Sequence, residues 1–187
     1  MKNTLPKFFD YDQDKVDAGY EALHDFFLSW TLRCASEEYT SINFKVQQYA
    51  KKIILHLLKL NDSPPLTIDK VMTQKQTNHI DLLVEVTITD ALNERKLYVL
   101  NIENKWYTPV SKTQLVKYDA ILKQKYHNTN AEIVNIVLFP DYEKIEESRA
   151  LCEASAYNIE VFEDLKELLT DGKTGNDLFD EFWFNFY

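Results

Sequence analysis

The sequence predicts an α/β protein in which a central sheet is covered by helices. Two helical stretches open the chain, and β-branched apolar segments alternate with helical ones from residue 79 onward. Elements mixed in this order favour helices layered on a sheet. The length of 187 residues suits one domain, so we expect residues 1–187 to form a single domain.

Residues 14–60 form the expected helical N-terminal part. Apolar residues recur at helical spacing over 14–35 and again over 42–60. The segment NDSPP at 61–65 then ends the second helix, because its residues favour turns and its prolines cannot continue a helix.

Strands and helices alternate in the expected core, residues 79–165. HIDLLVEVTIT and KLYVLNIENKW predict a hairpin of strands with a turn near 91–94. The pattern after the hairpin predicts, in order, helix 111–126, strand 133–139, helix 143–156, strand 158–162 and helix 163–170.

The acidic residues are concentrated at the C-terminal end. The net charge is −9, yet residues 1–130 hold 17 basic and 16 acidic residues, whereas 131–187 hold 4 and 14. A surface that binds a polyanion therefore stays possible on the first two-thirds of the chain. The tail, 171–187, is also aromatic, and we expect it to pack on the domain rather than form a dimer seam.

Several classes of function are excluded or disfavoured by composition. The three glycines form no phosphate-binding loop, and the two cysteines form no CxxC pair for zinc. No apolar run is long enough to span a bilayer, and the N-terminus lacks the apolar stretch of a signal peptide. We expect a cytoplasmic protein with no membrane partner.

The hairpin strands place acidic residues where chemistry could occur. A period of two puts Asp81 on one face of its strand and Glu103 with Lys105 on one face of the next. Two carboxylates suit a hard cation such as Mg²⁺, which also accepts phosphate oxygens, and a lysine there can offset developing charge. The alternative is a solvated strand end with a surface ion pair. Glu85 is either a further ligand or a paired core carboxylate, and we favour the latter.

These motifs resemble the PD-(D/E)XK nuclease superfamily. The match lies in the segments HIDLLVEV, NIENKW and QLVKY, and is closest to a subgroup of small bacterial proteins with I-D-L, I-E-N-K and Q-L-x-x-Y motifs. The resemblance implies a restriction-endonuclease-like fold, with a three-stranded meander plus a further strand flanked by helices.

The resemblance also implies roles for individual residues. Asp81 and Glu103 would be metal ligands, joined by the carbonyl of Asn104 and by a glutamate of the first core helix, for which Glu38 is favoured over Glu37. Lys105 would be the catalytic lysine and Gln114 a polar residue beside substrate or metal. Tyr118, one turn after Gln114, is either a substrate contact or a core residue, and Lys112 and Lys117 either contact phosphates or form a solvated helix face.

The implied function is a Mg²⁺-dependent nuclease, with Mn²⁺ as a substitute metal, acting on nucleic acid and with DNA favoured. The alternative is an inactive nuclease-fold module that binds nucleic acid or a protein partner. A homodimer is left open.

Overall fold

The structure is a computed structural model that describes residues 20–77, 80–106, 108–143 and 145–185. Its elements follow the predicted order, with one additional strand. In chain order they are α2 (Tyr20–Arg33), η1 (Glu37–Tyr39), α3 (Phe44–Leu57), β1 (Thr67–Thr77), β2 (Ile80–Thr89), β3 (Arg95–Asn104), α4 (Lys112–Tyr126), β4 (Glu132–Phe139), α5 (Ile145–Ala154), β5 (Asn158–Val161), α6 (Phe162–Glu167), α7 (Asp177–Asp180) and η2 (Glu181–Asn185).

The strands form one mixed sheet in the order β1-β2-β3-β4-β5. β1, β2 and β3 are an antiparallel meander, whereas β4 runs parallel to β3 and β5 parallel to β4. Each parallel pair requires a crossover, which α4 supplies between β3 and β4 and α5 between β4 and β5. The predicted α/β fold with a meander and a further strand flanked by helices is therefore confirmed.

The strand that periodicity missed is β1. Its sequence, TIDKVMTQKQT, carries few large apolar residues, and a bulge between Ile68 and Lys70 breaks the alternation that marks a strand. β1 is also an edge strand, and its Met72 side chain faces solvent. Because an edge strand buries less surface than a central one, its pattern is weaker.

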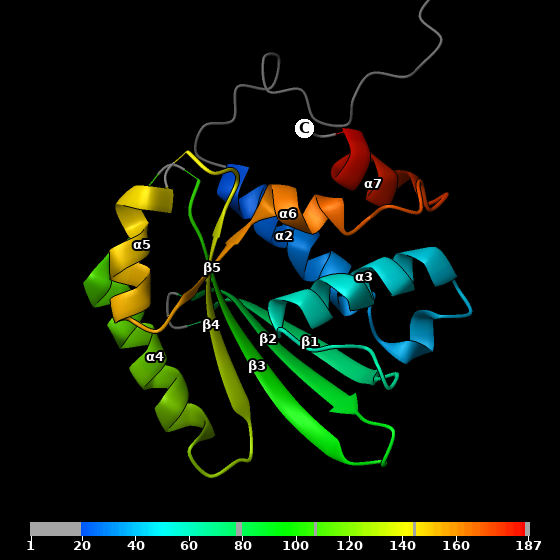
Figure 1. The fold of residues 1–187 in the computed structure, drawn as a ribbon, viewed down its shortest axis with the longest axis horizontal. Helices are drawn as coiled ribbons and strands as arrows, with labels where there is room; N and C mark the ends of the chain where they lie inside the picture. Colours follow the sequence, from blue (N-terminus) through cyan, green and yellow to red (C-terminus); the bar gives the residue numbers. More distant parts are fainter. Residues whose placement is uncertain (1–19, 78–79, 107, 144, 186–187) are drawn as a thin grey trace, which may run out of the picture.

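Helices cover both faces of the sheet. Figure 1 shows α4 and α5 on one side and α2, α3, α6 and α7 on the other. Alternate residues of β2 divide between these layers from Leu82 onward: Leu82, Val84 and Val86 pack with α2 and α3, whereas Leu83 packs with α4. The predicted period of two is confirmed over these residues, and the face that carries Asp81 is turned toward α4. Ile80, at the start of the strand, departs from the alternation and also packs on the α4 side.

The C-terminal aromatic residues pack into the larger core. Phe179, Phe182 and Trp183 are buried, and the Trp183 indole nitrogen donates a hydrogen bond to Thr31 Oγ1 of α2 at 3.0 Å. The Phe162 ring stacks on Trp183 with centroids 4.8 Å apart. The prediction that the tail packs on the domain is confirmed for these residues, whereas Phe186 and Tyr187 lie outside the described part of the chain.

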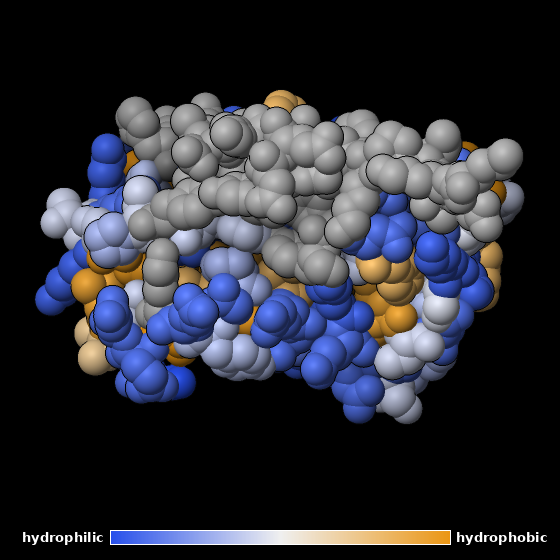
Figure 2. Space-filling model, turned by 90° about the horizontal axis from the view of Figure 1, so that it is seen from above, coloured by the Kyte–Doolittle hydropathy of each residue, from blue (hydrophilic) through white to orange (hydrophobic). Residues whose placement is uncertain are grey.

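Polar side chains dominate the described part of the face seen from above, with hydrophobic patches between them (Figure 2). Among the described residues, no helix has the length and hydropathy that crossing a membrane requires.

Candidate active site

The two acidic residues predicted from the hairpin lie at the same end of the β2–β3 pair. Leu82 pairs with Ile102, so Asp81 just before it and Glu103 just after it lie where the pairing ends. Glu103 lies in the run of buried residues that ends β3, and its side chain is 0% exposed. The backbone N–H of Lys105 continues the sheet by donating to the Leu138 carbonyl of β4 at 2.9 Å. The sheet itself therefore holds this strand end in place.

Glu103 is paired through one oxygen. Its Oε1 accepts a hydrogen bond from Gln114 Nε2 at 2.6 Å and lies 2.7 Å from Lys105 Nζ. The Lys105 ammonium lies 3.4 Å from Gln114 Oε1 as well. Gln114 is the third residue of α4, so the start of this helix lies over the end of β3. The Gln114 amide, the Glu103 carboxylate and the Lys105 ammonium are thus in mutual contact.

The other Glu103 oxygen lacks such a partner. Oε2 is buried and no described N–H or hydroxyl group donates to it. Burial and, after it, the Asp81 charge raise the pKa of Glu103, Lys105 opposes both, and the net result is a pKa of about 7. Like-charged carboxylates at one site favour the protonated form of one of them, whereas a bound cation would favour the charged form of both. A buried acceptor without a donor costs about 1–3 kcal/mol, so this oxygen indicates a ligand site.

A third acid, Asp25, comes from the helical layer. Asp81 Oδ2 accepts the backbone N–H of Asn104 at 3.0 Å, and Asn104 Nδ2 donates to Asp25 Oδ1 of α2 at 3.1 Å. Asp25 is 4% exposed, and its charge acts together with that of Asp81 on Lys75 of β1. The sequence analysis missed Asp25, although an aspartate among apolar helix positions, as in HDFF, was a usable signal.

Glu38 does not take the position that the resemblance gave it. It is exposed on η1, beside Glu37, and the acid that the helical part brings to the strand ends is Asp25. The reason is the length of the first helix: α2 ends at Arg33, so residues 37 and 38 fall in the connection that follows.

The remaining predicted residues lie along α4. Tyr118 is buried, and its hydroxyl accepts a hydrogen bond from Gln114 Nε2 at 2.9 Å, so it is a core residue that also contacts the site. Burial raises the pKa of Tyr118, which keeps the phenol neutral. Lys112 and Lys117 are exposed on the same helix. Glu85 is hydrogen-bonded to Tyr126 and lies 3.6 Å from Lys125, as expected for a paired carboxylate.

Buried polar side chains fasten α4 to the sheet. Asn101 Nδ2 of β3 donates to Asn135 Oδ1 at 2.8 Å and to the Tyr157 hydroxyl at 2.7 Å. Tyr157 then donates to the Leu115 carbonyl of α4 at 3.1 Å, and Asn135 Nδ2 donates to Asp119 Oδ1 at 3.0 Å. These contacts hold the first turns of α4, and with them Gln114, at a fixed height above β3.

The donor set fits a hard divalent cation that keeps water ligands. Within the described residues, no three His, Cys, Asp or Glu side chains converge as a metal site. Mg²⁺, however, binds proteins through one or two carboxylates and fills its other positions with water or phosphate oxygens. Asp81, Glu103 with its undonated Oε2, and the carbonyl of Asn104 are the residues that would hold it.

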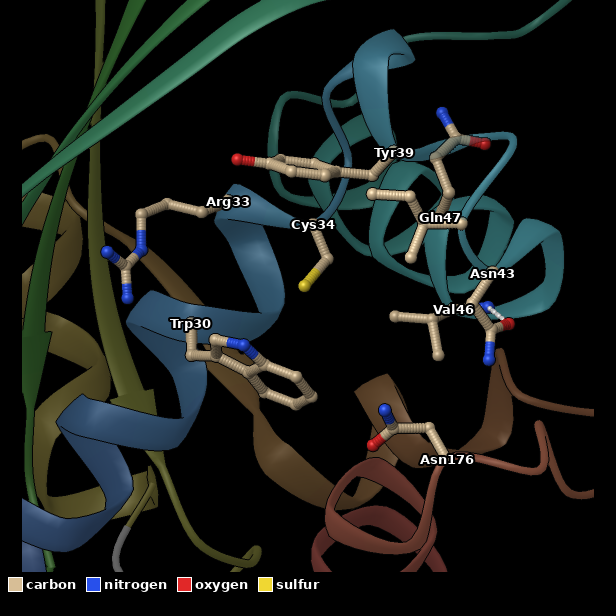
Figure 3. A pocket seen from close by; sticks show the side chains of 9 residues that line it. Trp30, Arg33, Cys34, Tyr39, Asn43, Val46, Gln47 and Asn176 are labelled. Atoms are coloured by element: carbon tan, nitrogen blue, oxygen red, sulfur yellow. Dashed lines mark hydrogen bonds between the residues drawn. The ribbon is translucent and has the colours of Figure 1, made fainter.

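The cavity in Figure 3 lies elsewhere, between α2, η1, α3 and the segment before α7. It has a volume of about 370 Å³ and a mainly apolar lining that includes Trp30, Cys34 and Val46. The Arg33 guanidinium points away from it. None of the acidic residues discussed above lines this cavity, so it is separate from the candidate active site.

A mixed sheet covered by helices, with an aspartate and a glutamate–lysine pair at neighbouring strand ends, defines a restriction-endonuclease-like fold. A family model described as the PD-(D/E)XK nuclease superfamily matches residues 13–177, and the chain belongs to this superfamily. A search of the curated proteins found no match, and neither did a search of the solved structures. The family resemblance carried by the sequence motifs is thus confirmed.

Proposed function

We propose that this protein hydrolyses phosphodiester bonds of nucleic acid with the help of Mg²⁺, and that DNA is its favoured substrate. The observation that carries the proposal is Glu103, a fully buried carboxylate beside Asp81 with the Lys105 ammonium 2.7 Å away. A buried charge cluster of this kind is costly to a fold unless it is paired or serves a function. Membership of a nuclease superfamily supports the same conclusion.

The chain's own residues have separable roles in this proposal. Asp81, Glu103 and the Asn104 carbonyl hold the cation, which when bound lowers the pKa of a water molecule and neutralises phosphate charge. Lys105 orients the attacking water and offsets the negative charge that grows on the phosphate oxygens. Gln114 fixes the orientation of Glu103 through their 2.6 Å hydrogen bond.

Lys112 and Lys117 are proposed to contact the nucleic-acid backbone. Both extend into solvent from α4, the helix that also carries Gln114. Contacts between lysine and phosphate are independent of sequence and weaken with salt. Replacing both lysines with alanine should therefore reduce the salt dependence of binding.

A cytoplasmic location and a homodimer remain predictions.

Cleavage of labelled DNA and RNA oligonucleotides, single- and double-stranded, tests the proposal. Wild-type protein should cut at least one of these in Mg²⁺ or Mn²⁺ and not in chelator, and Asp81→Asn should abolish cutting. Asp90→Asn is the matched control, because Asp90 lies in the β2–β3 turn at the opposite end of the strand. Tight binding of nucleic acid by the wild type without cutting would favour the inactive binding module, which the net charge of −9 also favours.

A further inference from the structure

Phe26 is an apolar ring presented to solvent beside the candidate active site. The ring is 64% exposed, whereas Asp25, one residue earlier on α2, is buried and accepts a hydrogen bond from Asn104 Nδ2. One turn of α2 therefore directs a carboxylate toward the strand ends and a phenyl ring outward.

Lys75 links this ring to the acidic residues. Its Nζ lies 3.3 Å from the centroid of the Phe26 ring and donates to the Ala22 carbonyl at 3.2 Å. Lys75 pairs with Leu82, the residue after Asp81, and the charges of Asp25 and Asp81 both act on its ammonium. Lys75 and the Phe26 ring therefore lie on the α2 side of the sheet, and Asp25, from the same turn of α2, contacts Asn104 at the strand ends. The ring lies beside the strand ends on that side.

An exposed aromatic ring beside a cation and a phosphate site has a common use. Proteins that bind single strands stack bases on such rings, while basic groups contact the backbone. The ammonium against the ring holds it in place by a cation–π contact. Bases inside a duplex are already stacked on their neighbours and must be unstacked at a cost before a ring can contact them, so an unpaired base is the favoured partner.

We propose that Phe26, held by Lys75, stacks on an unpaired base next to the phosphate that is cut, and that the substrate class is single-stranded nucleic acid or an unpaired end. This inference rests on the proposed nuclease function. It adds a preference for strand type that the acidic residues and Lys105 do not carry.

Binding of oligonucleotides in chelator, where nothing is cut, tests the inference directly. A single-stranded oligonucleotide of ten thymidines and a duplex of the same length serve as probes. Phe26→Ala should weaken binding to the single strand by about tenfold, within the range for loss of one base–aromatic stack, and leave duplex binding within about twofold. Phe26→Tyr should restore single-strand binding. Phe44→Ala is the matched control, since Phe44 begins α3 and is 61% exposed.

A fluorescence signal makes the contact visible without reference to activity. Phe26→Trp should be quenched by the single strand and not by the duplex, and Phe44→Trp by neither. Unchanged binding in Phe26→Ala together with no quenching in Phe26→Trp would overturn the stacking proposal while cleavage by the wild type still upheld the nuclease. A wild type that binds and cuts no nucleic acid would overturn both.

Discussion

Gln114 on α4 donates a 2.6 Å hydrogen bond to Glu103 on β3, and this contact ties a surface helix to the most buried acid of the site. The same amide nitrogen donates to the Tyr118 hydroxyl, and the amide oxygen faces Lys105 at 3.4 Å. Gln114 therefore sets which Glu103 oxygen is engaged, and it leaves Oε2 facing the proposed cation.

Removing this amide should impair catalysis more than folding. In Gln114→Ala, Glu103 keeps only Lys105 at Oε1 and is free to rotate, so we expect cleavage to fall about 10–100-fold, as for other residues that orient metal ligands. Val116→Ala, on an exposed position of the same helix, is the control. Steady-state cleavage rates measure the catalytic effect of each variant, and melting curves measure its effect on folding. Equal cleavage rates in Gln114→Ala and wild type would show that Gln114 has no role in the mechanism.

Lys105→Ala should lower the cleavage rate about 10²–10³-fold, as the loss of a preorganised charge at a reacting centre does. The Lys105 ammonium lies 2.7 Å from Glu103. Lys96→Ala removes an exposed lysine that pairs with Glu132 at the far end of β3 and should cut at the wild-type rate. Single-turnover cleavage measures both, and full activity in Lys105→Ala would contradict its role.

The raised pKa of Glu103 makes stability depend on pH. The carboxyl loses its proton near its ordinary value of 4.5 when unfolded and near 7 when folded. Between these values the folded state holds more protons, so stability falls as pH rises through this window. Glu103→Gln does not titrate there, and its unfolding free energy relative to wild type should rise by about 3 kcal/mol from pH 4 to pH 8.

Urea unfolding at the two pH values checks this linkage. Glu94→Gln alters an exposed glutamate beside the β2–β3 turn and should shift the same difference by less than about 0.5 kcal/mol. A Glu103→Gln difference that does not change with pH would mean that Glu103 has the same pKa in the folded and the unfolded protein.

Replacing Asp25 and replacing Glu38 should have different effects on metal affinity. Asp25 is buried against Asn104, so Asp25→Ala should weaken Mn²⁺ binding about tenfold by releasing that residue, as loss of an orienting partner does. Glu38 is exposed on η1, so Glu38→Ala should leave the affinity within about twofold. Isothermal titration of each variant decides between them, and the reverse result would return Glu38 to the site.

Local sequence patterns predicted the parts of the site that lie on strongly patterned strands. Sequence patterns could place Asp81, Glu103 and Lys105 on neighbouring strands, because the central residues of β2 and β3 are mostly apolar and alternate regularly. Gln114 was assigned by the resemblance to the nuclease superfamily, which places a polar residue at the start of the next helix. Asp25 could not be placed, since the packing of α2 on the sheet depends on contacts far apart in sequence. β1 was missed because its edge position and bulge remove the alternation.

Calorimetric titration of Mn²⁺ into wild-type protein and Asp81→Asn, each with and without a short oligonucleotide, tests whether the acids at the strand ends form a metal site. If Asp81 and Glu103 together hold the cation, binding is saturable in the wild type and at least about tenfold weaker in Asp81→Asn. Absence of saturable binding in the wild type under both conditions, or equal affinity in the variant, would contradict this metal site.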